Sequence, residues 1–98
     1  MYASVLIADL RLPLPDSLKA KRAVITPILE GARRRHRVAV SEVGHQDDHR
    51  RSELAFATVA SSEHLAREVL DAVERFVWSF PEIEVLSCHR GWLEEEED

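Results

Sequence analysis

The sequence predicts an α+β fold, with one four-stranded antiparallel sheet and two helices on one of its faces. Two observations predict this class. Apolar residues alternate over short stretches, as in strands, and recur every three or four residues over two longer stretches, as in helices. The stretches follow in the order β-α-β-β-α-β, which is typical of the split βαβ, or ferredoxin-like, sandwich. Right-handed crossovers would then place the first and third strands in the centre of the sheet.

The first strand is expected from Tyr2 to Leu12. Its leucines fall on one face, towards a core, whereas Val5 and Ile7 fall on the other. Two prolines follow the strand closely, and because proline cannot donate a backbone hydrogen bond, the strand must end before them.

The first helix is expected from Ser17 to about Arg35, with Asp16 or Ser17 as its N-cap. Pro27 leaves two possibilities: one kinked helix, or a break with Thr26 capping a second helix. The predicted inner stripe combines residues at helical spacing: Leu18, Arg22, Ile25, Leu29 and Ala32.

Three more strands and a second helix complete the fold. The strands are expected over residues 38–43, 53–60 and 83–89, and the first two of them form a hairpin. The second helix is capped by one of the serines at 61–62 and ends before Pro81. Its predicted inner stripe is apolar: Leu65, Val69, Ala72, Val73, Phe76 and Phe80.

This fold leaves one face of the sheet without a helix. Val5 and Ile7 lie on that face, and Trp78 lies outside the stripe of the second helix. Exposed apolar and tryptophan side chains often anchor interfaces. We therefore expect Val5, Ile7 and Trp78 to be interface residues; for Trp78 the alternative is packing across the last strand or the chain end.

Composition predicts a single soluble domain. Residues 1–93 form the domain, and residues 94–98 are an acidic tail, expected to be disordered, which accounts for the whole net charge of −5. Cys88 has no partner for a disulfide, and the chain shows neither a signal sequence nor an apolar run long enough to cross a membrane. We expect a cytoplasmic protein without a membrane partner.

Three cations open the first helix, where the helix dipole is already positive: Lys19, Lys21 and Arg22. Each is unfavourable there, so the cluster indicates a site for phosphate or another anion. The alternative is a structural role, in which Arg22 lays its stem on the core and pairs with Asp16 or Glu42.

Four arginines close the same helix: Arg33, Arg34, Arg35 and Arg37. Cations suit the negative end of a helix dipole, so these residues need no ligand to explain them. If the helix binds RNA, they would extend the contact surface along it.

No catalytic motif is present. Cys88 and His89 are adjacent in a strand, so they point to opposite faces and cannot form a nucleophile and base. The loop residues His45, Asp47, Asp48 and His49 are ligand types, but their spacing matches no metal site, and Asp47 is interpreted as a turn residue. We expect no enzyme activity, metal, cofactor or small-molecule substrate.

The segments SLKAKR (residues 17–22) and VAVSEVG (residues 38–44), with Asp47 shortly after, resemble the YlxP-like family, a bacterial family of unknown function. The resemblance implies a ferredoxin-like fold and no assigned activity. It also implies a set of polar motif residues: Lys19, Lys21, Arg22, Glu42 and Asp47. Family genes often lie beside genes of translation initiation and ribosome maturation, whereas Pro27 and the acidic tail depart from the family pattern.

Two functions follow as expectations. The first is a non-enzymatic factor that contacts structured RNA, including that of the ribosome, through the cationic ends of the first helix. The second is a homodimeric module that binds protein through its open sheet face.

Overall fold

The structure, a computed structural model, describes residues 1–96. The order β-α-β-β-α-β predicted from the sequence is confirmed. The elements are β1 (Tyr2–Arg11), α1 (Leu18–His36), β2 (Ala39–Gly44), β3 (Arg51–Ala60), α2 (Glu63–Trp78) and β4 (Glu84–Glu94).

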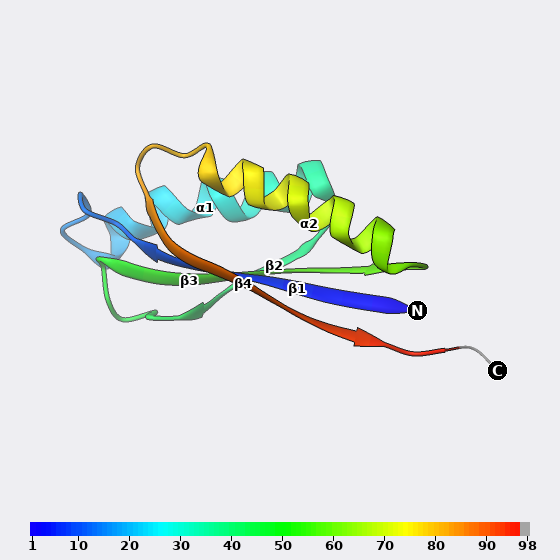
Figure 1. The fold of residues 1–98 in the computed structure, drawn as a ribbon. Helices are drawn as coiled ribbons and strands as arrows, with labels where there is room; N and C mark the ends of the chain where they lie inside the picture. The colour runs from blue at the N-terminus through cyan, green and yellow to red at the C-terminus, as the bar shows by residue number, and fades with distance from the viewer. Residues whose placement is uncertain (97–98) are drawn as a thin grey trace.

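The sheet is antiparallel throughout, with strand order β2-β3-β1-β4. The first and third strands are therefore central, as predicted. Both helices lie on the same face of the sheet, and the other face carries no helix (Figure 1). The domain is elongated, 52 × 21 × 19 Å, because β1, β3 and β4 run well past β2.

The core lies between the sheet and the helices. Leu6, Ala8 and Leu10 of β1 are fully buried, and Leu54 and Phe56 of β3 extend the same layer. Val5 and Ile7 lie on the opposite face and are only partly covered. The alternation predicted for the first strand is thus confirmed.

Helix α1 is continuous through Pro27, so the predicted alternative of a break is wrong. Its inner stripe is also rotated from the prediction. Lys21, rather than Arg22, is buried with Ile25, whereas Arg22 is exposed. Leu18 and Leu29, which drew the predicted stripe towards Arg22, are only partly buried.

Helix α2 is capped by Ser62, whose Oγ accepts from the Leu65 N–H at 3.3 Å. Leu65 was predicted to be inward but is 46% exposed. The prediction chose the larger of two adjacent apolar residues, and the smaller one, Ala66, is the buried one. The fully buried positions are Ala66, Leu70, Val73 and Val77.

Strand β4 is longer than predicted, since it passes His89 and ends at Glu94. Beyond it, the Glu95 N–H donates to the Met1 carbonyl at 3.0 Å, and the Met1 amino group donates to the Glu95 carbonyl at 2.9 Å. The predicted boundary at residue 93 is therefore wrong, because Glu94 and Glu95 pair with β1 and the residue before it. For residues 97–98 the prediction of disorder lies outside the described residues.

Within residues 1–96, neither α1 nor α2 has the length and apolar character needed to cross a membrane.

Candidate functional site

Lys21 lies on the inner side of α1, one turn after the Ser17 cap, and is 1% exposed. Its ammonium group forms an ion pair with Glu42, 2.8 Å from Nζ to Oε2. It also donates to backbone carbonyls of the loop that joins β2 to β3, here called the 45–51 loop. These are the carbonyls of His45 at 2.8 Å, Asp48 at 2.7 Å and Arg51 at 3.0 Å.

An ammonium group has three protons and no other polar function, so this shell satisfies it completely. Lys21 therefore holds the 45–51 loop against the start of α1 and is not available to an external anion. The prediction that Lys21 contributes to an anion site is wrong. The dipole of α1 is unfavourable for Lys21, but carbonyls of a loop distant in the sequence offset it.

Glu42 completes this buried polar group. Its Oε2 also accepts from the hydroxyl of Ser52 at 2.6 Å, and Ser52 is fully buried on β3. The sequence suggested Glu42 as a partner of Arg22, but Lys21 is the partner found. Since a buried carboxylate needs both a cation and hydrogen bonds, Glu42 has a structural role here.

The turn residue of the loop is Asp48 rather than Asp47. Asp48 Oδ1 accepts from the Arg50 N–H at 2.8 Å, and this bond lowers the pKa of the Asp48 carboxyl from its usual value. Asp47 is exposed, and within residues 1–96 its side chain makes no hydrogen bond or ion pair. Adjacent aspartates are equivalent in a sequence pattern, so only the loop geometry distinguishes them.

The other two cations of the first turns remain on the surface. Lys19 and Arg22 are exposed, and their side chains have no ion pair or hydrogen bond with any residue from 1 to 96. Arg50, which the sequence reading did not select, lies at the same end of the molecule and donates to the Pro13 carbonyl at 3.3 Å. Its basic character was visible in the sequence, but its position beside the start of α1 was not.

The four arginines at the C-terminal end of α1 fall into different environments. Arg33 pairs with Glu30 at 2.8 Å, and its hydrogen bond lowers the pKa of the Glu30 carboxyl. Arg35 lies over the ring of Phe76, 5.2 Å from the ring centroid. Arg34 and Arg37 are exposed, and the described part of the chain provides them with no acidic partner.

The three predicted interface residues do not share one surface. Val5 and Ile7 lie on the sheet face without helices. Trp78, 60% exposed, ends α2 on the opposite side of the sheet. One flat interface therefore cannot contain all three residues.

Cys88 and His89 point to opposite faces of β4, as the strand alternation predicted. Cys88 is paired with Ala8 on the helix side, and His89 is paired with Ile7 on the open side. Burial raises the pKa of the Cys88 thiol, which keeps it protonated. This geometry does not provide a thiolate nucleophile.

The loop residues considered as metal ligands do not come together as a set. His45 instead lies beside Asp9 and Glu53, and the ligand atoms of these three side chains are all within 4.8 Å of one another. Sequence reading missed this group because its members come from the ends of three different segments.

The element order, the strand order and the one-sided helix layer define a ferredoxin-like α+β domain. A solved structure supports this class: a de novo designed protein with a ferredoxin fold, determined by solution NMR. The similarity covers 97% of this chain and 87% of the designed chain, with a TM-score of 0.51 and 13% sequence identity. At this sequence identity, the similarity shows a shared fold only.

The model of a family described as "Protein of unknown function (DUF503)" matches residues 4–90, and the chain belongs to this family. It is 40% identical over 77 residues to the uncharacterized protein YlxP of Bacillus subtilis (strain 168), over 79% of this chain and 84% of that protein. The resemblance to the YlxP-like family is thus confirmed. Neither name specifies an activity.

Proposed function

We propose that this protein is a non-enzymatic cytoplasmic factor that binds structured RNA, such as that of the ribosome, through the outer side of α1. The supporting observation is two groups of exposed cations, one at each end of this helix and away from its buried side, here together called the cationic stripe. The stripe consists of Lys19, Arg22, Arg33, Arg34 and Arg37.

The stripe is nearly free of opposing charge. Within residues 1–96, Glu30 is the acid that pairs with it, through Arg33. At about 1.5 Å per residue, the stripe spans roughly 27 Å from Lys19 to Arg37. That length suits a double-stranded RNA segment, whose recognition depends largely on phosphates and 2′-hydroxyls. Arg35, against Phe76, lies at its side.

Lys21 does not enter this surface, but it supports it. By holding the 45–51 loop to the first turns of α1, it keeps Arg50 at the same end of the molecule as Lys19 and Arg22. The loss of one predicted contact residue is therefore partly compensated by an arginine from the loop.

The test is the binding of a structured RNA hairpin at several salt concentrations. Each phosphate contact contributes a slope of up to about −0.9 in a plot of log K against log salt. We expect two double variants, Lys19→Ala with Arg22→Ala and Arg34→Ala with Arg37→Ala, to lower the affinity for RNA. In each, the slope of log K against log salt should become shallower by the equivalent of about one to two phosphate contacts. The matched control is Arg67→Ala, which removes an arginine of α2 already paired with Glu63.

A salt-independent affinity would contradict the proposal. Equal losses in the stripe variants and in the Arg67 control would do so as well, because they would show a general effect of charge. Circular dichroism on each variant separates loss of binding from loss of folding.

We propose as a second function that two copies associate through the sheet face without helices. Its centre is built of small and β-branched residues, with Val5 and Ile7 of β1 facing Ala57 and Ala55 of β3. Val59, on the same face, is 72% exposed. Within residues 1–96 no helix covers this face (Figure 1).

A second copy suits this face better than an unrelated chain. The apolar centre is flanked by small residues, Gly91 of β4 and Ala39 of β2, so the surface is smooth enough for a sheet to approach at about 10 Å. A two-fold axis through this centre sets apolar surface against identical apolar surface. With that axis perpendicular to the strands, the charged ends of the two sheets lie apart.

Sedimentation equilibrium tests the association. We expect a dimer for the native chain and a shift to monomer for Ile7→Glu and for Val59→Glu, the latter at a more exposed position of the same face. Leu65→Glu is the control, since Leu65 is exposed on α2, on the other side of the sheet. A monomeric native chain at tens of micromolar would remove this proposal.

A further inference from the structure

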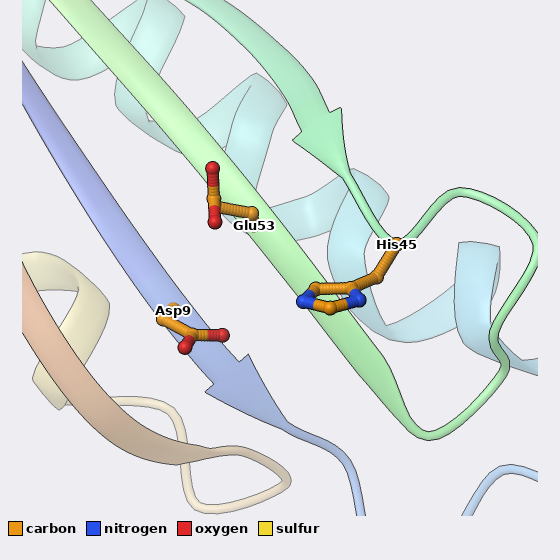
Figure 2. Close-up of side chains that lie close together, drawn as sticks. All are labelled: Asp9, His45 and Glu53. Atoms are coloured by element: carbon orange, nitrogen blue, oxygen red, sulfur yellow. The ribbon is translucent and has the colours of Figure 1, made fainter.

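Three side chains of metal-binding type meet on the open face of the sheet, where β1 ends and β3 begins. Asp9 comes from β1, Glu53 from β3, and His45 from the residue that follows β2 (Figure 2). Their ligand atoms all lie within 4.8 Å of one another. Asp9 and Glu53 are half-buried and His45 is exposed.

The two carboxylates form an unfavourable pair. Asp9 and Glu53 are direct cross-strand partners in the register of β1 and β3. Like charges in this position repel each other and destabilise a sheet. A cation between the two carboxylates would remove this repulsion.

Neighbouring arginine side chains neutralise only part of the negative charge of the two carboxylates. Arg51 Nη2 donates to both oxygens of Asp9, at 2.9 and 3.0 Å. Arg11, the diagonal neighbour that could serve Glu53, pairs instead with Glu84 at 3.2 Å. Within residues 1–96 the Glu53 carboxylate has no hydrogen-bonded or ion-paired partner, so one guanidinium offsets two carboxylates.

The backbone directs His45 to this pair. The register of β2 and β3 shifts between Glu42 and Gly44, and His45 follows in a left-handed conformation with φ of 59°. Bulges of this kind change the direction of a side chain. From the other side of the sheet, Lys21 Nζ holds the His45 carbonyl at 2.8 Å. The imidazole thereby lies over β3, on the side of Asp9 (Figure 2).

We propose that Asp9, His45 and Glu53 bind a divalent transition-metal ion of the zinc class. One imidazole and two carboxylates suit Zn²⁺, and they suit Mg²⁺ or Ca²⁺ poorly because these ions prefer oxygen ligands alone. The ion supplies the positive charge that the facing carboxylates lack. Small rotations of the exposed imidazole and of Glu53 close the ligand distances, and water completes the coordination.

Arg51 has a positioning role in this site. Its hydrogen bonds orient the Asp9 carboxylate, as the outer partners of metal ligands commonly do. Its positive charge also repels the metal ion, so the affinity is expected to be lower than that of a site without an adjacent cation. The site is on the opposite side of the sheet from the cationic stripe and does not depend on RNA binding.

The test is calorimetric titration of the tag-free full chain with zinc chloride. We expect saturable binding of a single ion per chain, weakened at least about tenfold by His45→Ala and by Glu53→Gln. His49→Ala is the matched control, because His49 belongs to the same loop but not to the group. Cys88→Ser should also keep the native affinity, which excludes zinc binding by the free thiol.

Thermal unfolding provides an independent measurement. Zinc should raise the melting temperature of the native chain and of His49→Ala, and leave that of His45→Ala unchanged. Because His45 is exposed, His45→Ala should fold as the native chain does without metal. Absence of saturable binding in the native chain, or equal affinity in the native chain and in His45→Ala, would overturn the proposal.

Discussion

At the scale of single residues, the buried ammonium group of Lys21 determines the role of the first turns of α1. Lys21 is 1% exposed and is surrounded by a carboxylate and loop carbonyls. Lys21→Met keeps the length of the side chain but leaves Glu42 as a buried charge without its cation. We expect the free energy of unfolding to fall by about 3–5 kcal/mol, the usual cost of breaking a buried ion pair. Urea denaturation measures it.

Lys19→Met is the matched control, since Lys19 is exposed on the same helix turn. Surface substitutions of this kind usually change stability by no more than about 0.5 kcal/mol. Similar values for the two variants would show that Lys21 does not hold the loop as described.

Asp48 gives a prediction of pH dependence. The Arg50 N–H lowers the pKa of Asp48 below its ordinary value of 3.8, so the carboxylate is favoured in the folded state. A lowered pKa stabilises the fold above the unfolded-state pKa, and this contribution disappears as the pH falls through the folded-state pKa. Asp48→Asn should therefore flatten the acid limb of the stability curve. Asp47→Asn, at the neighbouring exposed position, should leave that limb unchanged in urea denaturation series between pH 2 and 6, a range set to bracket carboxyl titration.

At the scale of elements, the strands could be predicted because alternation of side chains is a local property. Leu6, Ala8 and Leu10 follow it closely, and their burial agrees with the pattern. Helix phase was less certain. A lysine on the inner side of a helix contradicts hydropathy, and the carbonyls that accept its protons belong to a loop far along the chain.

The candidate sites were harder to predict for the same reason. Lys19 is exposed, as its place outside the predicted stripe of α1 indicated, whereas Arg22 was predicted within that stripe and is exposed instead. The group of Asp9, His45 and Glu53 depends on strand register and on a bulge, and neither follows from composition or spacing. Sequence patterns describe one element at a time, whereas this group requires three.

The contact between the two helices gives a prediction at the same scale. Gly31 of α1 lies against Phe76 of α2, and a Cβ at residue 31 would meet the ring Cζ at 2.5 Å. Gly31→Ala gains up to about 1 kcal/mol of helix propensity but overpacks the contact at about 1–3 kcal/mol. We expect a net loss of stability, measured by thermal unfolding.

Gly91→Ala is the matched control, because nothing lies within 4 Å of its added Cβ. The same substitution at that position should be close to neutral. A stabilised Gly31→Ala would show that Phe76 yields without cost, and that the helices are not closely fitted there.

At the scale of the whole molecule, the sheet separates the two proposed interaction surfaces. The cationic stripe belongs to α1, and both helices cover one face of the sheet (Figure 1). Ile7 lies on the opposite face of the sheet from the buried Leu6 and Ala8. In a dimer joined through the open faces, the two stripes point away from each other. One short hairpin therefore cannot contact both copies at once.

It follows that the two surfaces should act independently on a short RNA. Distant substitutions without shared partners usually add within about 0.3–0.5 kcal/mol. We expect Ile7→Glu to abolish self-association while leaving affinity for a short hairpin unchanged, and Lys19→Ala with Arg22→Ala to have the reverse effect. Sedimentation and RNA titration on the same preparations measure both. If Ile7→Glu also weakened hairpin binding in a folded chain, the RNA would have to contact both copies, and the outward placement of the stripes would be incorrect.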